Sequence, residues 1–142
     1  MPKPNPAEIA ERLHRAAIRL LRAMRAADVE SGLSGPKLSA LSVLAFAGPQ
    51  SLSSLARAEQ VRAPTMSKLV ADLECEGLAA KRADKADRRS VVVAVTAKGR
   101  ALMEAGRARR LALLRARFAK FSAAELQTLA AAAELMLQGA SD

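Results

Sequence analysis

The sequence predicts a mainly α-helical protein with one small β-hairpin, in the order helix, helix, helix, helix, strand, strand, helix, helix (H-H-H-H-β-β-H-H). Apolar residues recur at spacings of three and four over most of the chain, which is the pattern of amphipathic helices. Aromatic residues make up only 2% of the 142 residues, so alanine and leucine, both good helix formers, do most of the packing. Residues 90–95 are instead β-branched almost throughout. A chain of this length most simply forms one domain.

The first predicted helix begins at Asn5, which can cap it, with Pro6 in its first turn and Glu8 close to its N-terminus. Ser31-Gly32 ends this helix. Its apolar stripe consists of Ile9, Leu13, Ala17, Leu20, Met24 and Ala27. A second helix is expected from Ser34-Gly35-Pro36 to Gly48-Pro49. Its inward-facing residues are Leu38, Leu41, Leu44 and Ala45.

Two shorter helices are predicted over residues 53–59 and 64–76, joined by a turn at Val61-Arg62-Ala63. Pro64 opens the second of them, and Gly77 is expected to take the left-handed conformation just beyond its end. Their inward-facing residues are Leu52, Leu55, Ala56, Met66, Leu69, Val70 and Leu73. Thr65, Lys68 and Asp72 lie on the opposite face of the second helix.

Residues 78–83 and 90–95 are predicted to pair as the strands of a hairpin. Thr96 then caps a long, arginine-rich helix over residues 97–120, and Ser122 with Glu125 forms the capping box of a last helix. The apolar residues expected to make contacts in these two helices are Leu102, Leu111, Leu114, Phe118, Phe121, Leu126, Leu129, Ala133 and Met136.

The net charge of +9 and the isoelectric point near 10.8 favour a polyanionic partner, because binding to phosphates releases counterions. Charge alone leaves three readings: a nucleic-acid partner, an anionic membrane surface, or a basic surface that keeps the protein in solution. The basic residues lie in the hairpin and across several helices rather than along one helix, which argues against a membrane surface. The sequence has neither a run of about 18 apolar residues nor the apolar run of a signal peptide. We therefore expect a cytoplasmic protein that does not bind membranes.

The sequence offers no pattern for catalysis or metal binding. Cys75 is the only cysteine and His14 the only histidine, and they lie in different segments. They therefore provide no disulfide, zinc site or Cys/His pair. The glycines are scattered as helix stops and form no phosphate-binding loop. We expect no enzyme activity, cofactor or metal, and we interpret Cys75 as a buried or half-buried structural thiol and His14 as a surface or interface residue.

The helix over residues 64–76 has the side chains of a DNA-recognition helix. Such a helix places its N-terminal side chains against base edges in the major groove. Here that end offers Pro64, Thr65, Ser67 and Lys68, and the first carboxylate is that of Asp72. The side chains of Thr65 and Lys68 can donate hydrogen bonds to bases or phosphates, and Pro64 can touch a thymine methyl group.

The tip of the hairpin, residues 83–89, is too charged to pack and too basic for a neutral turn. Arg89 is predicted to enter a narrow, A·T-rich minor groove, where the negative potential is enhanced. Arg88 and Lys85 are expected to contact phosphates. Asp87 cannot favour a phosphate, so we expect it to pair with an arginine and orient it. Together the two elements predict a winged helix-turn-helix protein that binds double-stranded DNA.

A set of residues at fixed spacing resembles the pattern of the MarR family of bacterial winged helix-turn-helix regulators. The set consists of Leu55-Ala56, Leu73-Glu74, Gly77-Leu78, Asp87-Arg88-Arg89, Val91, Val93, Val95-Thr96 and Gly99. The resemblance implies that the wing arginine falls on Arg89, its partner acid on Asp87, and the recognition contacts on Pro64, Thr65 and Lys68. It also implies a homodimer formed by the first, fifth and sixth helices, which binds a palindromic operator. Many members repress transcription until a small-molecule effector binds between the dimer region and the winged region.

The resemblance divides the single MarR-like domain, residues 1–142, into dimerisation helices over 1–32 and 97–142 and a DNA-binding region over 33–96. Amphipathic helices that have little of their own domain to pack against usually pair across a two-fold axis. The arginines of the fifth helix are expected to form a solvated face or to pair with acids across the dimer. Because the chain has no Tyr or Trp, an effector pocket would be walled by Leu, Met, Ala and Phe46.

We therefore expect a sequence-specific transcriptional regulator that acts as a repressor. The alternative is an architectural protein that binds DNA with low sequence preference. The high isoelectric point suits this alternative, but the concentration of polar groups on one helix does not.

Overall fold

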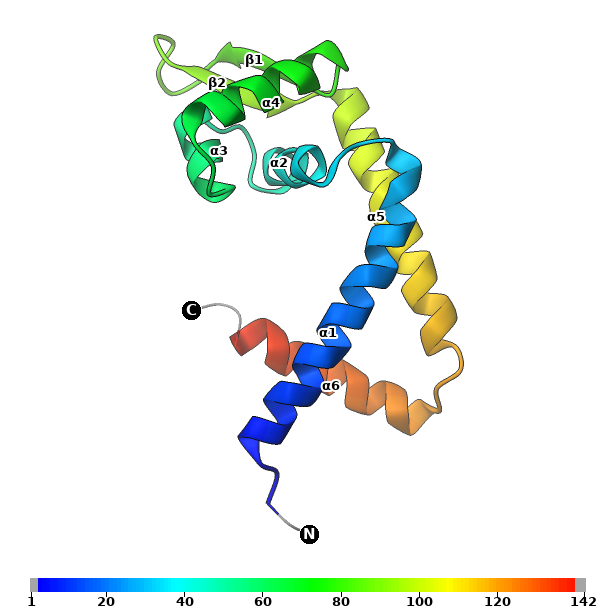
Figure 1. Ribbon diagram of the computed structural model, residues 1–142. Coiled ribbons are helices and arrows are strands. Elements are labelled where there is room, and N and C mark those ends of the chain that lie inside the picture. Colours follow the sequence, from blue (N-terminus) through cyan, green and yellow to red (C-terminus); the bar gives the residue numbers. More distant parts are fainter. Residues whose placement is uncertain (1–2, 140–142) are drawn as a thin grey trace.

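A pair of long helices carries a lobe of shorter elements at one end, as a computed structural model that describes residues 3–139 shows (Figure 1). The order of elements is the predicted one, with a short 3₁₀ turn added after the first helix. The elements are α1 (Pro6–Asp28), η1 (Val29–Ser31), α2 (Gly35–Phe46), α3 (Leu52–Ala58), α4 (Ala63–Cys75), β1 (Ala79–Ala83), β2 (Val91–Val95), α5 (Ala97–Phe118) and α6 (Ala123–Gly139). Residues 1–2 and 140–142, the ends of the predicted dimerisation segments, lie outside the described residues.

The hydrophobic core lies in the lobe, between α2, α3, α4 and the hairpin. Its fully buried large side chains are Leu41, Leu44, Leu55, Met66, Val70, Leu73, Leu78 and Val93. The helical members of this set are residues that the spacing of apolar positions predicted. Met103 of α5 also reaches the core, with 5% of its surface exposed, and this contact was not predicted.

The predicted helix caps are confirmed. The side chain of Asn5 accepts a hydrogen bond from the backbone of Ala7, at 3.0 Å. The hydroxyl of Thr96 accepts one from the backbone of Gly99, also at 3.0 Å. Ser122 and Glu125 form the reciprocal capping box, with backbone-to-side-chain distances of 2.8 and 3.3 Å. Each cap satisfies backbone donors that would otherwise lack a partner at a helix start.

The hairpin is antiparallel, with Ala79 opposite Val95 and Ala83 opposite Val91. Both strands begin one residue later than predicted. Gln50, between α2 and α3, adds an unpredicted bridge to the free edge of β2 through two backbone hydrogen bonds to Val93, of 3.0 and 2.7 Å. β2 is thereby the central strand of a small sheet, with Gln50 on one edge and β1 on the other.

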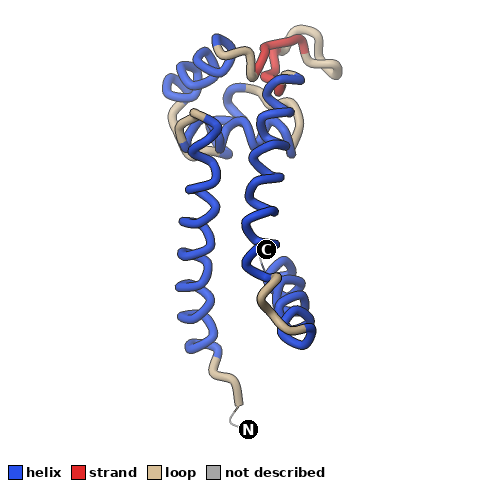
Figure 2. Tube along the Cα trace, turned by 90° about the vertical axis from the view of Figure 1, so that its right-hand side faces the viewer, coloured by secondary structure: helices blue, strands red, loops and turns tan. Residues whose placement is uncertain are grey.

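The stem consists of α1 and α5, which run side by side away from the lobe (Figure 2). Within the described part of the chain, neither α1 nor α6 contains a buried residue. Ile9, Leu13 and Leu21 of α1 and Leu126 and Met136 of α6 have 51%, 42%, 46%, 40% and 41% of their surface exposed. The apolar faces of α1 and α6 are therefore open in the single chain. No helix among residues 3–139 is long and apolar enough to span a membrane.

Candidate nucleic-acid interface

The helix α4 divides into a buried face and an exposed polar face. Met66, Val70 and Leu73 occupy one side at helical spacing and are completely buried. The opposite side at the N-terminal end presents the four residues that the sequence predicted as DNA contacts, Pro64, Thr65, Ser67 and Lys68, and all four are exposed. The packing of the core residues thus fixes which face of α4 points outward.

The short helix α3 precedes α4 and packs against it, as in a helix-turn-helix unit (Figure 1). Gln60 in the turn between them has a φ of 54°, in the left-handed region. The backbone N–H of Val61 then donates to the carbonyl of Ala56, at 3.0 Å, and closes the turn. The left-handed residue was not predicted, since it is neither glycine nor asparagine.

The wing tip is ordered by its two aspartates. Asp84 accepts a hydrogen bond from the backbone of Ala86, at 3.1 Å. Asp87 accepts one from the backbone of Arg89, at 3.1 Å, and one from the hydroxyl of Ser90, at 3.0 Å. The expectation that Asp87 pairs with an arginine side chain is therefore wrong: its carboxylate folds back on the nearest N–H in a local turn.

The cations of the wing tip remain available to a ligand. Lys85, Arg88 and Arg89 are exposed, and no ion pair neutralises them within residues 3–139. Figure 1 shows the hairpin and α4 together at the end of the lobe farthest from α6, with the tip of the hairpin extending beyond the other elements. The structure thus brings the eight predicted DNA contacts to one end of the molecule, four on α4 and four on the wing.

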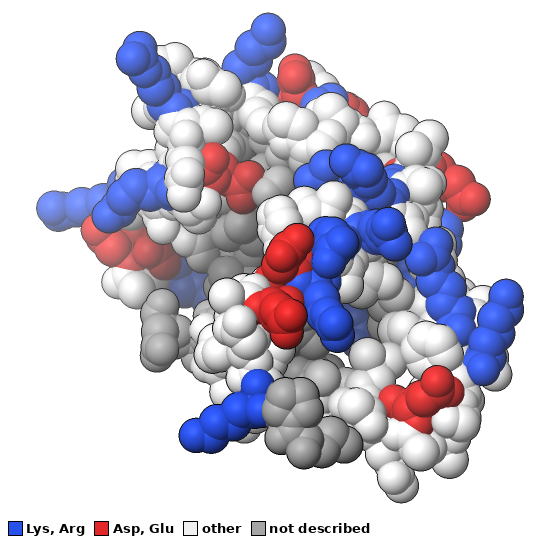
Figure 3. Space-filling model, turned by 60° about the horizontal axis from the view of Figure 1, so that its bottom comes forward, with Lys and Arg blue, Asp and Glu red and all other residues white. Residues whose placement is uncertain are grey.

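Positive charge is not confined to this end. Figure 3, which looks at the molecule from the side of the stem, shows Lys and Arg side chains there too, interspersed with acidic ones. Net charge alone would therefore not locate the DNA-binding surface. The polar face of α4 and the unpaired cations of the wing are what locate it.

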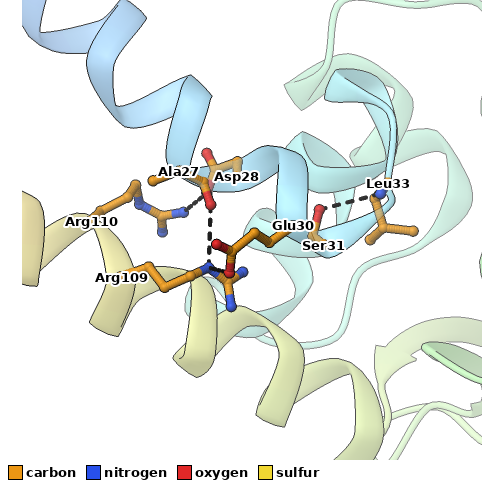
Figure 4. A network of polar contacts seen from close by, with 7 residues as sticks. All are labelled: Ala27, Asp28, Glu30, Ser31, Leu33, Arg109 and Arg110. Atoms are coloured by element: carbon orange, nitrogen blue, oxygen red, sulfur yellow. Dashed lines mark hydrogen bonds and ion pairs between the residues drawn. The ribbon is translucent and has the colours of Figure 1, made fainter.

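Arg109 and Arg110 of α5 are partly shielded and paired, whereas Arg107, Arg115 and Arg117 are exposed, as expected of a solvated face. Arg110 hydrogen-bonds the carboxylate of Asp28, at 2.5 Å (Figure 4). Arg109 donates to the backbone carbonyl of Ala27, at 3.2 Å, and pairs with Glu30, at 3.5 Å. These two arginines therefore pair within the chain, because Asp28 at the end of α1 and Glu30 of η1 lie next to α5. In the sequence, the acidic residues Asp28 and Glu30 were the signal that could have predicted partners for these arginines.

A cleft of about 510 Å³ adjoins this network, lined by Arg25, Asp28, Val29, Leu33, Gly35 and Leu38. It lies where the stem meets the lobe. Phe46, which we expected to wall such a pocket, has 68% of its surface exposed instead. Cys75 was also expected to be at least half-buried, but it is exposed. It follows Leu73 by two residues, which turns its side chain away from the buried face of α4.

A short helix, an outward-facing second helix and a basic hairpin directly after it define a winged helix-turn-helix DNA-binding protein. The model of the MarR family matches residues 33–91, which contain α2, α3, α4, β1 and the tip of the wing. The chain belongs to the MarR family, and it is a DNA-binding transcriptional regulator rather than an enzyme.

Relatives and solved structures agree with this assignment. The chain is 36% identical over 131 residues to "Uncharacterized HTH-type transcriptional regulator Mb0904" of Mycobacterium bovis, covering 92% of each chain. Its fold is similar to a MarR family protein from Bacillus stearothermophilus, with a TM-score of 0.83 and 22% identity over 96% of this chain and 95% of that one. It is also similar to CouR from Rhodococcus jostii bound to p-coumaroyl-CoA, with a TM-score of 0.61 and 26% identity over 90% of each chain. Dimers are typical of this family.

Proposed function

We propose that this regulator represses transcription in the cytoplasm by binding a palindromic operator as a homodimer. Each copy places α4 in the major groove and Arg89 of its wing in the adjacent minor groove. The half-sites should lie about one helical turn apart, roughly 10 base pairs, so that both lobes contact the same face of the duplex. The observation that carries the proposal is the exposure of all eight predicted contacts at one end of the molecule.

Sequence reading is assigned to the first turns of α4. Lys68 and Thr65 carry hydrogen-bond donors on the exposed face, and a lysine suits the acceptors on a guanine edge. Ser67 can bond either a base or a phosphate, and Pro64 offers an apolar contact to a thymine methyl group. No carboxylate of α4 precedes Asp72, so the end that approaches the phosphates is free of repulsive charge.

The wing supplies minor-groove and backbone contacts. Arg89 is assigned to the groove, and Arg88 and Lys85 to phosphates. Asp87 supports these contacts indirectly, because its hydrogen bonds to Arg89 and Ser90 limit the conformations of the loop before DNA arrives. A loop that is already ordered loses less conformational entropy on binding.

The dimer interface is assigned to α1, α5 and α6, within residues 1–32 and 97–142. α1 and α6 expose several large apolar side chains, and exposed apolar surface of this kind marks interaction sites. Phe118 and Phe121, with ring centroids 5.9 Å apart, add an aromatic pair at the turn between α5 and α6. A second copy of the chain is the partner that would cover these faces symmetrically.

A small-molecule effector is proposed to bind the cleft between α1 and α2. Val29, Leu33 and Leu38 would contact its apolar part, and Arg25 would contact an acidic group. The related CouR was solved with a bound thioester, p-coumaroyl-CoA, which supports a ligand-responsive role. An occupant there would push on the junction of stem and lobe and thereby change the separation of the two α4 helices.

Selection of bound duplexes from a random pool by the purified protein tests the proposal. We expect a two-fold symmetric consensus that competes at least ~10³-fold better than random duplex at physiological salt. A consensus without symmetry would refute the palindromic dimer. Binding without any consensus would favour the architectural alternative.

A further inference from the structure

The C-terminal end of α4 carries charges of the wrong sign for a helix. Asp72 and Glu74 lie in its last turn, Glu76 is the capping residue, and the last turn has no basic residue. The helix dipole is negative at this end, so carboxylates there are unfavourable unless cations compensate them. These carboxylates break the usual charge preference at a helix C-terminus. The cations that compensate them are therefore candidates for a functional role.

The compensating cations come from three other elements. Lys37 of α2 forms a hydrogen-bonded ion pair with the carboxylate of Glu76, and this bond raises the pKa of Lys37. Lys81 of β1 lies 3.9 Å from the carboxylate of Glu74, which also accepts a bond of 3.1 Å from the backbone of Lys81. Lys98 of α5 donates to the backbone carbonyl of Glu76, at 2.8 Å.

Thr96, the N-cap residue of α5, binds the two residues that follow the end of α4. The hydroxyl of Thr96 donates to the carbonyl of Gly77, at 2.6 Å, and the backbone N–H of Thr96 donates to the carbonyl of Leu78, at 3.0 Å. A Cβ on Gly77 would lie 3.8 Å from the side-chain stem of Lys98, so this stem covers the glycine. The end of α4 is therefore held simultaneously by α2 and α5.

We propose that Lys37 and Lys98 are positioning residues for DNA binding: by holding α4 at Glu76, they set the angle at which its N-terminal end enters the major groove. The inference rests on the DNA-binding role proposed for α4. A helix of 13 residues is about 20 Å long, so a tilt of about 10° at one end moves the other by ~3 Å. Hydrogen bonds to base edges do not survive such a displacement.

Charge reversal across the Lys37–Glu76 pair separates positioning from long-range attraction. If Lys37 acted only through its charge, Lys37→Glu would weaken DNA binding, Glu76→Lys would tighten it, and the two effects would add. If Lys37 instead positions α4, each single variant should bind DNA about tenfold more weakly. The double variant should then recover an affinity within about threefold of the original. Affinity is measured on the duplex selected by the unaltered protein, and an additive cycle with a tighter Glu76→Lys variant overturns the inference.

Lys98 is tested with side chains of similar length. Lys98→Met keeps the stem over Gly77 but removes the donor, and we expect about fivefold weaker binding with an unchanged melting temperature. Lys98→Arg restores a donor and should bind within about twofold of the original. Lys120→Met, which removes the same charge beyond α5, is the matched control. Equal affinities of the Lys98→Met and Lys120→Met variants overturn the role of Lys98.

Hydrogen exchange on the free protein tests the same contact without DNA. Lys98→Met should accelerate exchange of the amides of Glu76 and Gly77, which bond to Asp72 and Glu74 at 3.1 and 2.9 Å. Unchanged exchange shows that Lys98 does not hold this end and contradicts the inference. If the unaltered protein selects no duplex, the proposed function fails, whereas the exchange result still reports on the contact.

Discussion

The guanidinium of Arg110 in α5 binds the carboxylate of Asp28 at the end of α1, with 2.5 Å between Nη1 and Oδ1, across 82 residues of sequence. Both side chains are mostly shielded from solvent, with 25% and 20% of their surface exposed. Gly106 lies beside the pair, and a Cβ there would approach the Arg110 guanidinium to 3.3 Å. The absence of a side chain at this position therefore leaves room for the guanidinium where it binds Asp28.

We predict that Asp28→Asn lowers the free energy of unfolding by about 1–2 kcal/mol, because it weakens a shielded hydrogen bond between charged groups. Urea denaturation at fixed protein concentration measures the change. Glu30→Gln is the matched control, since its carboxylate is 73% exposed and lies 3.5 Å from Arg109. We expect that control to cost less than about 0.5 kcal/mol. Equal losses in the two variants would contradict this ranking.

Gly99→Ala should destabilise the lobe by at least about 2 kcal/mol. A Cβ at this position would lie 2.2 Å from the backbone carbonyl oxygen of Leu78, and a backbone atom cannot move away as a flexible side chain can. Thermal unfolding followed by circular dichroism reports the loss. Gly35→Ala provides the comparison, because nothing lies within 4 Å of the added atom. A Gly99→Ala protein as stable as the Gly35→Ala protein would contradict the close approach of Gly99 to the backbone of Leu78.

Lys68→Ala should change the preferred operator sequence more than the overall affinity. Its ammonium lies on the exposed face of α4, where a base contact contributes about 1–3 kcal/mol of discrimination at one position. Duplex selection with the variant should lose preference at one base pair in each half-site. The same consensus from the variant and the unaltered protein would exclude base reading by Lys68.

Replacing Leu126 and Met136 of α6 with lysine should give a monomer. Both side chains are about two-fifths exposed in the single chain, and a buried, unpaired charge in an interface costs several kcal/mol. Analytical ultracentrifugation determines the mass of the species in solution. A dimer that persists at micromolar concentration would place the interface elsewhere.

Much of the fold follows from local patterns in the sequence. Asn5, Thr96 and the pair Ser122–Glu125 cap helices through neighbours within three residues, so their signals are contained in short windows. The core of α2, α3 and α4 follows from apolar spacing for the same reason. The same spacing predicted the outward face of α4, and a charged turn between two strand-like segments predicted the wing.

Contacts between distant segments were missed. Arg110 and Asp28, or Lys98 and Glu76, meet only because α5 returns along α1 and beside α4, which no local window reveals. Asp87 was misassigned for a different reason: its backbone neighbours are nearer than any guanidinium, so the local turn prevails over the ion pair. The exposure of Cys75 and Phe46 shows that apolar character alone does not place a side chain near a helix end.

The salt dependence of DNA affinity tests the contact between the wing and DNA. Arg89→Ala should weaken binding to the selected duplex and lower the slope of log affinity against log salt by about one, because one fewer counterion is released. Arg117→Ala removes the same charge at the far end of α5 and should leave the slope within experimental error. An unchanged slope for Arg89→Ala would remove Arg89 from the DNA contacts.

Hydroxyl-radical footprinting of the selected duplex shows whether Arg89 enters the minor groove, because it maps protection of that groove nucleotide by nucleotide. We predict two protected minor-groove segments related by the symmetry of the operator, both lost with Arg89→Ala, while protection of guanine N7 in the major groove, probed separately with dimethyl sulfate, persists. Protection on one side only, or the same footprint with and without Arg89, would contradict this prediction.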